Sequence, residues 1–315
     1  MNIRTMGSTG MAVSAVGLGL WGMGSWSGSD DGRNREVLRH AMASGCNFFD
    51  SAFVYGNGYS DALLGAVARE HADRPLILAS KIPPADFKWP SSPNNTLHTI
   101  FPHAHVLDYA DRIRRALGRP IDLLQFHVWE DVWAGEAEWQ DTVAQLKSSG
   151  AIRAFGLSLN RWQPENGLAA IETGLVDTVQ VIYNVFDQAP EDRLFPLCRA
   201  RNIGVIARVP LDEGSLGGKL TLETRFPQND WRSGYFNPVR LAETVRRVEE
   251  LKKELPEGMS LPELALRFIL SEPAVSTLIA GMRTREHVQG NLAAAAKGPL
   301  APDLIARLRA HRWNR

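Results

Sequence analysis

Four polar residues whose side chains could together move a proton follow three successive apolar runs of the sequence. Asp50 and Tyr55 stand in "NFFDSAFVYGNGYSDALLG" (47–65), Lys81 ends "LILASK", and His127 ends "IDLLQFH". A tyrosine is a poor proton donor at neutral pH because its ordinary pKa is about 10. A nearby ammonium lowers that pKa, a carboxylate keeps the ammonium charged, and a neutral imidazole can hydrogen-bond a substrate oxygen. The set is therefore suited to exchange a proton with a carbonyl or alcohol oxygen, with a cofactor as the hydride partner.

Each of these residues also has a purely structural interpretation. Asp50 could cap a helix, Lys81 could lie on the surface, and His127 could be a core side chain. Because the residue types are chemically complementary and come at the ends of consecutive runs, a shared site is favoured over separate structural roles.

The elements that must position these residues are short strands alternating with helical patterns. The apolar runs are continuous rather than alternating, which indicates strands buried on both faces of a parallel sheet. Eight such units favour a closed (β/α)8 TIM barrel over an open doubly wound sheet. No linker divides the chain, so a single domain over 1–315 is expected. The expected strands are 15–20, 47–52, 76–81, 121–127, 152–158, 177–183, 203–209 and 275–281, and the expected helices are 33–45, 60–71, 106–118, 137–149, 164–173, 191–201, 239–255 and 261–271.

Two long connections, 83–105 and 211–238, follow the third and seventh expected strands. Both are expected at the C-terminal face of the barrel, where barrel enzymes keep their sites. The tryptophans of the loops at this face predict an aromatic mouth that contacts substrate: Trp21, Trp26, Trp89, Trp129 and Trp231. The polar residues of the two long loops could bind hydroxyls or an anionic group: Asp86, Lys88, Asn229 and Arg232. Such a mouth suits sugars and other polyols as well as ring ketones and aromatic aldehydes.

Composition excludes several classes of protein. The 315 residues carry 35 basic and 35 acidic side chains, so the basic footprint of a nucleic-acid binder is missing. Cys46 and Cys198 are too few for a disulfide framework and fit a reducing cytoplasm. A membrane partner is not expected, because no apolar run reaches the length of about 18 residues that a spanning helix needs. The apolar N-terminal stretch is interrupted by glycines, which favours a short hairpin leading into the first strand over a signal peptide.

Two further patterns could suggest a binding site, but other features of the sequence favour different interpretations. "GLGLWG" (17–22) matches the dinucleotide fingerprint by letter, but the following "GMGSWSGSDDG" cannot form the helix that the fingerprint requires. The glycines instead allow the first strand and its loop to approach a ligand above the barrel. His98, His103 and His105 could suggest a metal, but no cysteine or carboxylate spacing accompanies them, so they are interpreted as lid residues and no metal is expected.

The motifs resemble the aldo-keto reductase superfamily, whose members are NAD(P)H-dependent barrel oxidoreductases, over essentially the whole chain. The matching segments are "RTMGSTGMAVSAVGLGLW", "FFDSAFVYGNGYSDALLG", "IDLLQFHVW", "GAIRAFGLSLN", "VQVIYN", "VPLDEGSLGGKL", "ELALRFIL" and "LIAGMRTREHVQGN". The resemblance implies a hairpin that caps the barrel. It also implies a catalytic tetrad of Asp50, Tyr55, Lys81 and His127, in which Tyr55 is the general acid in reduction and the base in oxidation.

The resemblance also implies a nucleotide site that favours NADP(H) over NAD(H). Ser158, Asn160 and Gln180 would bind the nicotinamide carboxamide, although the family usually has Ser and Asn adjacent and here Leu159 separates them. Tyr183 would stack on the nicotinamide ring. Arg283, assisted by Arg285, would pair with a 2′-phosphate at a helix N-terminus. The remaining implied cofactor contacts are Gly19, Trp21 and Asp50 at the mouth, Arg208, Val209, Pro210, Leu211, Gly214, Ser215 and Lys219 over the pyrophosphate, and Gly281, Met282, His287 and Asn291 near the adenosine.

Three functions fit this sequence. The leading one is reduction of an aldehyde or ketone, reversible to alcohol oxidation, on a small-molecule substrate. A cofactor-sensing regulatory subunit and a sugar epimerase that retains NADP are the alternatives. The sequence does not give the oligomeric state.

Overall fold

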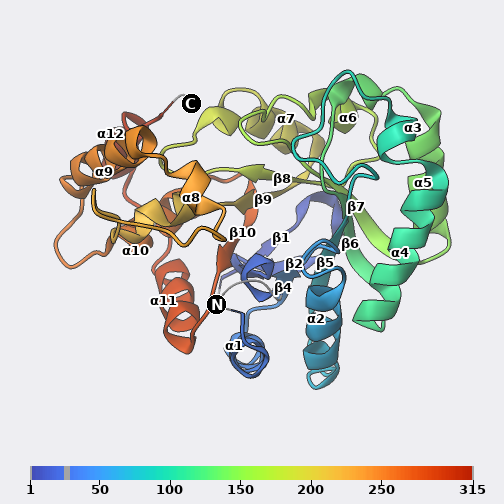
Figure 1. Cartoon of the computed structure of the whole chain (residues 1–315), viewed down its shortest axis with the longest axis horizontal. Helices are drawn as coiled ribbons and strands as arrows, with labels where there is room; N and C mark the ends of the chain where they lie inside the picture. Colours follow the sequence, from blue (N-terminus) through green and yellow to red (C-terminus); the bar gives the residue numbers. More distant parts are fainter. Residues whose placement is uncertain (1, 25–28, 314–315) are drawn as a thin grey trace.

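A closed barrel of eight parallel strands forms the centre of the molecule (Figure 1). The computed structural model describes residues 2–24 and 29–313. Neighbouring strands around the barrel follow the order β10-β3-β4-β5-β6-β7-β8-β9. Their bounds are β3 (Val16–Gly19), β4 (Phe48–Asp50), β5 (Ile77–Ile82), β6 (Ile121–Phe126), β7 (Ile152–Ser158), β8 (Thr178–Ile182), β9 (Gly204–Arg208) and β10 (Val275–Gly281). Each expected strand overlaps one of these, and the predicted (β/α)8 barrel is confirmed.

Helices connect the strands and surround the barrel (Figure 1). They are α1 (Asp31–Ala43), α2 (Tyr59–Arg69), α3 (Leu97–Ile100), α4 (His103–Leu117), α5 (Ala137–Ser148), α6 (Leu168–Glu172), α7 (Leu194–Arg201), α8 (Arg232–Tyr235), α9 (Pro238–Lys252), α10 (Leu261–Leu270), α11 (Arg285–Ala296) and α12 (Pro302–Arg309). Side-chain caps begin several of them; for example, Asp30 accepts a hydrogen bond of 2.8 Å from the Arg33 amide. All eight expected helices overlap observed ones, whereas α3, α8 and α12 were not expected.

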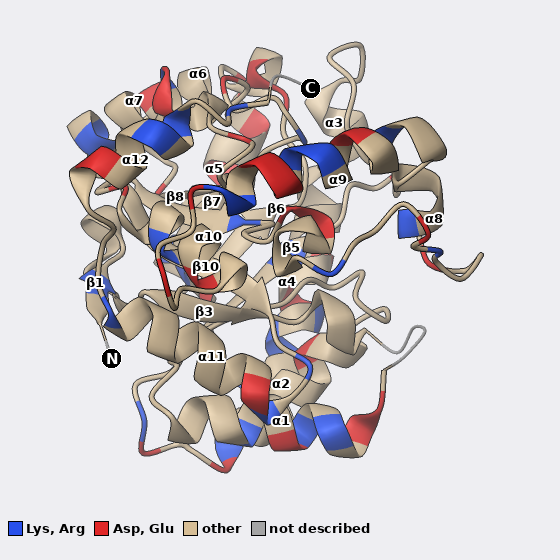
Figure 2. Ribbon diagram, turned by 90° about the vertical axis from the view of Figure 1, so that its left-hand side faces the viewer, with Lys and Arg blue, Asp and Glu red and all other residues tan. Residues whose placement is uncertain are grey.

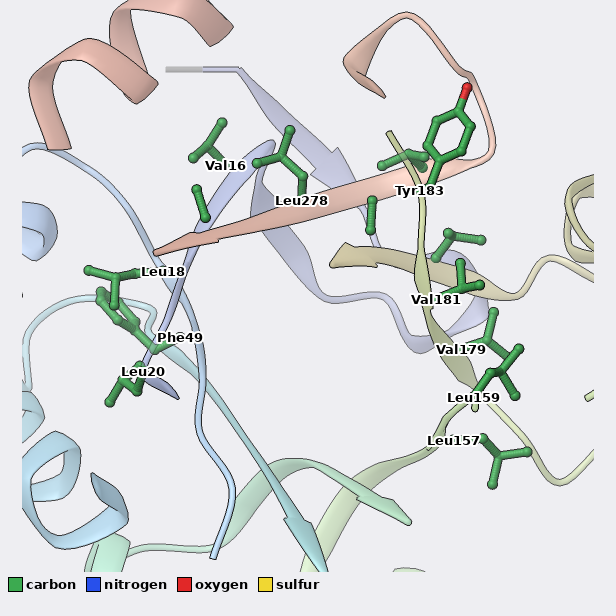
Figure 3. Close-up of a cluster of buried hydrophobic side chains, with 14 of the residues drawn as sticks. Val16, Leu18, Leu20, Phe49, Leu157, Leu159, Val179, Val181, Tyr183 and Leu278 are labelled. Carbon is green, nitrogen blue, oxygen red and sulfur yellow. The ribbon is translucent and has the colours of Figure 1, made fainter. Parts of the chain in front are cut away.

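Alternation along the strands divides the buried side chains into two layers. One residue of each adjacent pair packs outward against the helices, as Phe49, Val179, Val181 and Leu278 do (Figure 3). The other faces the barrel interior, whose apolar part contains Phe48, Ile77, Ala79, Leu123, Ala154 and Ile206. Two residues further along their strands, the same inward face carries polar side chains: Asp50, Lys81, Gln125 and Arg208. The polar layer therefore lies at the C-terminal end of the barrel.

A hairpin closes the opposite end. β1 (Ile3–Thr5) and β2 (Ala12–Ser14) pair antiparallel, and Met6, Met11 and Val13 of this segment belong to the apolar cluster inside the barrel. A Cβ at Gly204 would lie 2.6 Å from the Met6 side chain. Met6 therefore fits into the end of the barrel because β9 begins with a glycine. The predicted capping hairpin is thus confirmed.

Two long loops lie at the C-terminal face. The loop after β5 contains α3, and the loop after β9 contains the 3-10 segment η5 (Asp212–Gly217) and α8. Shorter 3-10 turns occur elsewhere as η1 (Gly7–Thr9), η2 (Trp21–Met23), η3 (Asp131–Trp133) and η4 (Ala189–Glu191). Basic and acidic residues alternate along α9 instead of gathering by sign (Figure 2). Within the described part of the chain, no helix has the length and apolarity to cross a membrane.

Gly65 provides a test of the helix packing. A Cβ at this position of α2 would lie 2.5 Å from the carbonyl oxygen of Leu117, at the end of α4. We expect Gly65→Ala to lower the free energy of unfolding by about 1–3 kcal/mol, because α2 and α4 would have to separate. Urea denaturation measures this change.

Gly290→Ala is the matched control, since Gly290 also lies within a helix but has no heavy atom within 4 Å of a built Cβ. It should leave stability unchanged or raise it by up to about 1 kcal/mol. Equal stability of Gly65→Ala and the wild type would contradict the close approach of α2 to α4.

Candidate active site

The centre of the candidate site is an ion pair enclosed by the barrel. Lys81 on β5 and Asp50 on β4 are 0% and 1% exposed, and Lys81 Nζ lies 2.5 Å from Asp50 Oδ2. The same ammonium donates to the Ser51 carbonyl oxygen at 2.7 Å. Two buried amides, from Gln125 and Gln180, donate to Asp50 Oδ1 at 3.0 and 2.9 Å. Both charges are therefore hydrogen-bonded on several sides, as buried charges must be if their desolvation is to be offset.

Tyr55 lies above this pair, in the turn after β4. Lys81 Nζ is 5.4 Å from the centre of the Tyr55 ring. Burial raises the pKa of the Tyr55 phenol, and the charge of Lys81 lowers it; burial dominates, so the net direction is upward. The phenol is thus protonated at neutral pH, and the ammonium is placed to stabilise a phenolate when the proton leaves.

His127 completes the group from the end of β6. Its ring lies 6.0 Å from that of Tyr55, in an edge-to-face arrangement. Burial, followed by the positive charges of Lys81 and Arg208, holds the pKa of His127 well below its usual value, so the imidazole is neutral. Its buried Nδ1 has no hydrogen-bond partner. The structure thus brings the four predicted residues together at one end of the barrel.

The predicted carboxamide residues lie beside this group with different partners. Ser158 ends β7 and is buried. The Asn160 amide nitrogen donates to Glu130 Oε1 at 2.7 Å and to the Trp129 carbonyl oxygen at 3.0 Å, while its buried Oδ1 has no partner. The Gln180 amide nitrogen instead donates to the Asp50 carboxylate. Asn160 therefore holds a buried acceptor without a partner, and Gln180 supports the ion pair.

Two predicted mouth residues lie elsewhere. Tyr183 shares the outward face of its strand with Val181, its ring packs against Phe195 and Phe268, and its hydroxyl donates to Glu191 at 2.7 Å (Figure 3). This position is incompatible with stacking on a ring at the mouth, because strand alternation directs Tyr183 away from the interior.

Trp129 is also a core residue. It is 0% exposed and packs against the rings of Trp133 and Trp139, and its indole nitrogen donates to Asp131. The placement in a strand-end loop was correct, but this loop folds back under α5 instead of lining the mouth.

Three of the predicted mouth tryptophans form an aromatic rim. Trp89 lies 5.4 Å from the His127 ring, and Trp21 lies 6.4 Å from Trp231, joining the loop after β3 to the loop after β9. All three are partly exposed. Trp26 lies outside the described residues.

The segment after β9 has a strained backbone. Val209, Asp212 and Glu213 adopt φ values of 56°, 45° and 56°, in the left-handed region that is uncommon for residues other than glycine and least favourable for the β-branched Val209. The Val209 carbonyl oxygen accepts a hydrogen bond of 3.0 Å from Asn184, and Glu213 pairs with Arg161 at 2.6 Å. Such strain clusters at functional sites. The residues implied to cover the pyrophosphate lie in or next to this segment: Pro210, Leu211, Gly214, Ser215 and Lys219.

The implied adenosine-side residues lie around the start of α11, which Thr284 caps. Arg283 approaches the loop after β3, since a Cβ at Gly22 would lie 3.1 Å from Arg283 Nε. Arg285 pairs with Glu36 at 2.6 Å, so its guanidinium is engaged on α1. Of the other implied contacts, Gly281 is exposed at the end of β10 and Met282 is buried. On α11, His287 Nδ1 accepts a hydrogen bond from the Arg283 amide, and Asn291 is buried.

The three loop histidines have separate partners. His98 contacts Glu138, His103 contacts Thr142, and His105 contacts the Pro83 carbonyl oxygen. Over residues 2–24 and 29–313, no group of three or more histidine, cysteine or carboxylate side chains is arranged to hold a metal ion.

Sequence reasoning missed Asp61, a second carboxylate buried near Lys81. Ser80 donates to Asp61 Oδ1 at 2.8 Å, and Oδ2 has no partner. Burial raises the pKa of Asp61 to about 6, although the hydroxyls of Ser51 and Ser80 and the charge of Lys81 lower it. In the sequence it looks like an ordinary acidic residue in the first turn of α2, so only its burial reveals it.

Asp61 makes stability depend on pH. The folded protein holds the Asp61 proton more tightly than the unfolded chain, whose aspartates have a pKa of about 3.9. Stability is therefore lost as the pH rises from about 4 through about 6, by up to about 3 kcal/mol, and is constant above. Asp61→Asn should lack this loss, so its unfolding free energy relative to wild type should rise between pH 4 and pH 7. A difference that is the same at every pH would contradict the raised pKa.

Comparisons with known proteins identify the family to which the chain belongs. The family model "Aldo/keto reductase family" matches residues 15–312. The aldo-keto reductase YhdN of Bacillus subtilis is 29% identical, over 90% of this chain and 85% of its own. The NADH-specific methylglyoxal reductase of Escherichia coli is 25% identical over 92% of each chain. The structure of a glycerol dehydrogenase from Gluconobacter oxydans superposes with a TM-score of 0.80 and 25% identity, covering 98% of this chain and 94% of that one. The chain belongs to the aldo/keto reductase family, oxidoreductases that act on carbonyl and alcohol groups.

Proposed function

We propose that the protein interconverts a carbonyl compound and its alcohol with NADP(H), and that Tyr55 exchanges the proton. The observation that carries this proposal is the position of Tyr55 at the C-terminal end of the barrel, with its ring centre 5.4 Å from a buried ammonium and beside a neutral imidazole.

In the direction of reduction, Tyr55 donates its hydroxyl proton to the substrate oxygen. The chemistry that the bound nucleotide supplies is hydride transfer to the carbonyl carbon. Lys81 stabilises the phenolate that remains, and Asp50 with its two amide donors keeps Lys81 charged and in place. His127, being neutral, can donate a hydrogen bond to the same oxygen from Nε2 if its proton resides there. In oxidation the Tyr55 phenolate takes the proton back.

The residues present fit a nicotinamide nucleotide. The unpartnered Asn160 Oδ1 is an acceptor for an amide N–H₂ group, which a carboxamide provides. The start of α11 is a helix N-terminus, which favours the negative charge of phosphate groups. Arg283 beside α11 supports a 2′-phosphate and hence NADPH. One relative is named as NADH-specific, so the proposed preference for NADPH rests on Arg283.

The substrates that we propose are small polar carbonyls and polyols. Two relatives are named for methylglyoxal and glycerol, and the rim of Trp21, Trp89 and Trp231 gives flat apolar surfaces on which the C–H faces of such molecules can pack. We place the enzyme in the cytoplasm, because Cys46 and Cys198 are both unpaired and buried.

The role of Tyr55 is tested by Tyr55→Phe. Loss of the hydroxyl should lower kcat for aldehyde reduction by about 10²–10⁴-fold, since a general acid contributes about that much. The dissociation constant for NADPH should change little, because the ring is kept. Steady-state kinetics and nucleotide fluorescence measure the two quantities.

Tyr109→Phe is the matched control, because Tyr109 lies on α4 and packs by its ring against Phe53. It should retain the wild-type rate. A Tyr55→Phe enzyme that turns over as fast as the control would refute the assigned acid.

The cofactor preference is tested by Arg283→Ala. Loss of a charge-assisted hydrogen bond to the 2′-phosphate should weaken NADPH binding by about 10–100-fold and leave NADH binding nearly unchanged. Arg285→Ala is the control, because Arg285 is already paired with Glu36. Equal losses for the two nucleotides in Arg283→Ala would rule out the 2′-phosphate contact.

A further inference from the structure

Arg208 introduces a positive charge into the candidate site that the proposed mechanism does not use. It is the last residue of β9 and shares the inward face of that strand with Ile206. Its Nη2 donates to the Leu159 carbonyl oxygen at 2.8 Å, and its buried Nε has no partner. Among the described residues, no carboxylate oxygen lies within 4.0 Å of its guanidinium nitrogens.

The neighbouring charges are already paired. Lys81 pairs with Asp50 at 2.5 Å, and Arg161 pairs with Glu213 at 2.6 Å. Arg208, by contrast, forms no ion pair of its own with any residue that the structure describes: its hydrogen-bond partner is the Leu159 carbonyl oxygen. Burial lowers the pKa of Arg208 to about 10, so the guanidinium is still charged at neutral pH. Its charge reaches both Tyr55 and His127, whose pKa values it lowers.

Arg208 is linked both to the proposed carboxamide site, by a hydrogen bond, and to the proposed proton donor, by its charge. The residue to which it donates, Leu159, separates Ser158 from Asn160, the residues proposed to hold the carboxamide. The charge of Arg208 also acts on Tyr55, the proposed proton donor. A nicotinamide that is held by Ser158 and Asn160, and whose substrate receives its proton from Tyr55, must lie within electrostatic reach of Arg208.

We propose that Arg208 sets the redox preference of the bound cofactor, by disfavouring the oxidised nicotinamide, which is positively charged, relative to the neutral reduced form. This inference rests on the proposed function. Two positive charges in a partly desolvated site repel each other, whereas a cation and a neutral ring do not. The protein should accordingly bind NADPH more tightly than NADP⁺. After the carbonyl compound has been reduced, the NADP⁺ that is formed should therefore dissociate readily.

The test is the ratio of the dissociation constants of NADP⁺ and NADPH, measured by fluorescence titration without substrate. Arg208→Met removes the charge and Arg208→Gln removes it while keeping an N–H donor for Leu159. Both should lower the ratio by about tenfold, equivalent to about 1.4 kcal/mol. Arg208→Lys keeps the charge and should keep the ratio within about twofold of the wild type.

The ratio separates electrostatics from structural damage. The two nucleotides differ only in the nicotinamide ring, so a distorted loop should weaken both and leave their ratio unchanged. Arg240→Met is the matched control, since the Arg240 guanidinium lies over the rings of Trp162 and Tyr235 instead of inside the barrel. It removes the same charge and should not move the ratio.

The outcomes are distinct. If Arg208→Met and Arg208→Gln bind both nucleotides with the wild-type ratio, or if Arg208→Lys lowers the ratio as much as they do, the inference is overturned. If the wild-type protein binds neither nucleotide, the proposed function itself fails.

Discussion

The structure depends on keeping a lysine ammonium inside a closed barrel. Removing such a charge from water costs several kcal/mol, and the loss is offset only when a counter-ion and further hydrogen bonds surround it. Here the counter-ion comes from β4 and is fixed by amides from β6 and β8, the latter 130 residues away in sequence. The ion pair can therefore exist only when the barrel is closed. The phenol and imidazole above it depend on the same closure.

Strand alternation decides which residues reach this environment. The expected strands and the convergence of Asp50, Lys81 and His127 could be read from the sequence, because apolar runs ending in polar residues indicate strand ends and consecutive strand ends are neighbours in a barrel. Tyr183 shows the limit of that reasoning. A shift of one residue at a strand end reverses the direction of the side chain, and the pattern of "VQVIYN" does not show which phase applies.

Other features of the site depend on tertiary packing that no local pattern reveals. Trp129 stands in a strand-end loop, yet it belongs to the core because that loop folds under α5. Asp61 and Glu130 look like surface carboxylates in sequence, and their burial follows from the elements around them. The strained backbone at Val209 is equally invisible, because a valine in sequence indicates an ordinary extended residue. These are the positions at which local preference and final structure disagree, as is common at functional sites.

The sealed floor of the barrel has a consequence for traffic through the molecule. Met6 and Met11 close one end of the barrel, so substrate and nucleotide would both approach from the C-terminal end, beside the tryptophans of the rim. When two ligands enter from the same end, the one that lies deeper must bind first and dissociate last. For two ligands that must contact each other, the hairpin that closes the N-terminal end of the barrel thus imposes an order of binding at the C-terminal end.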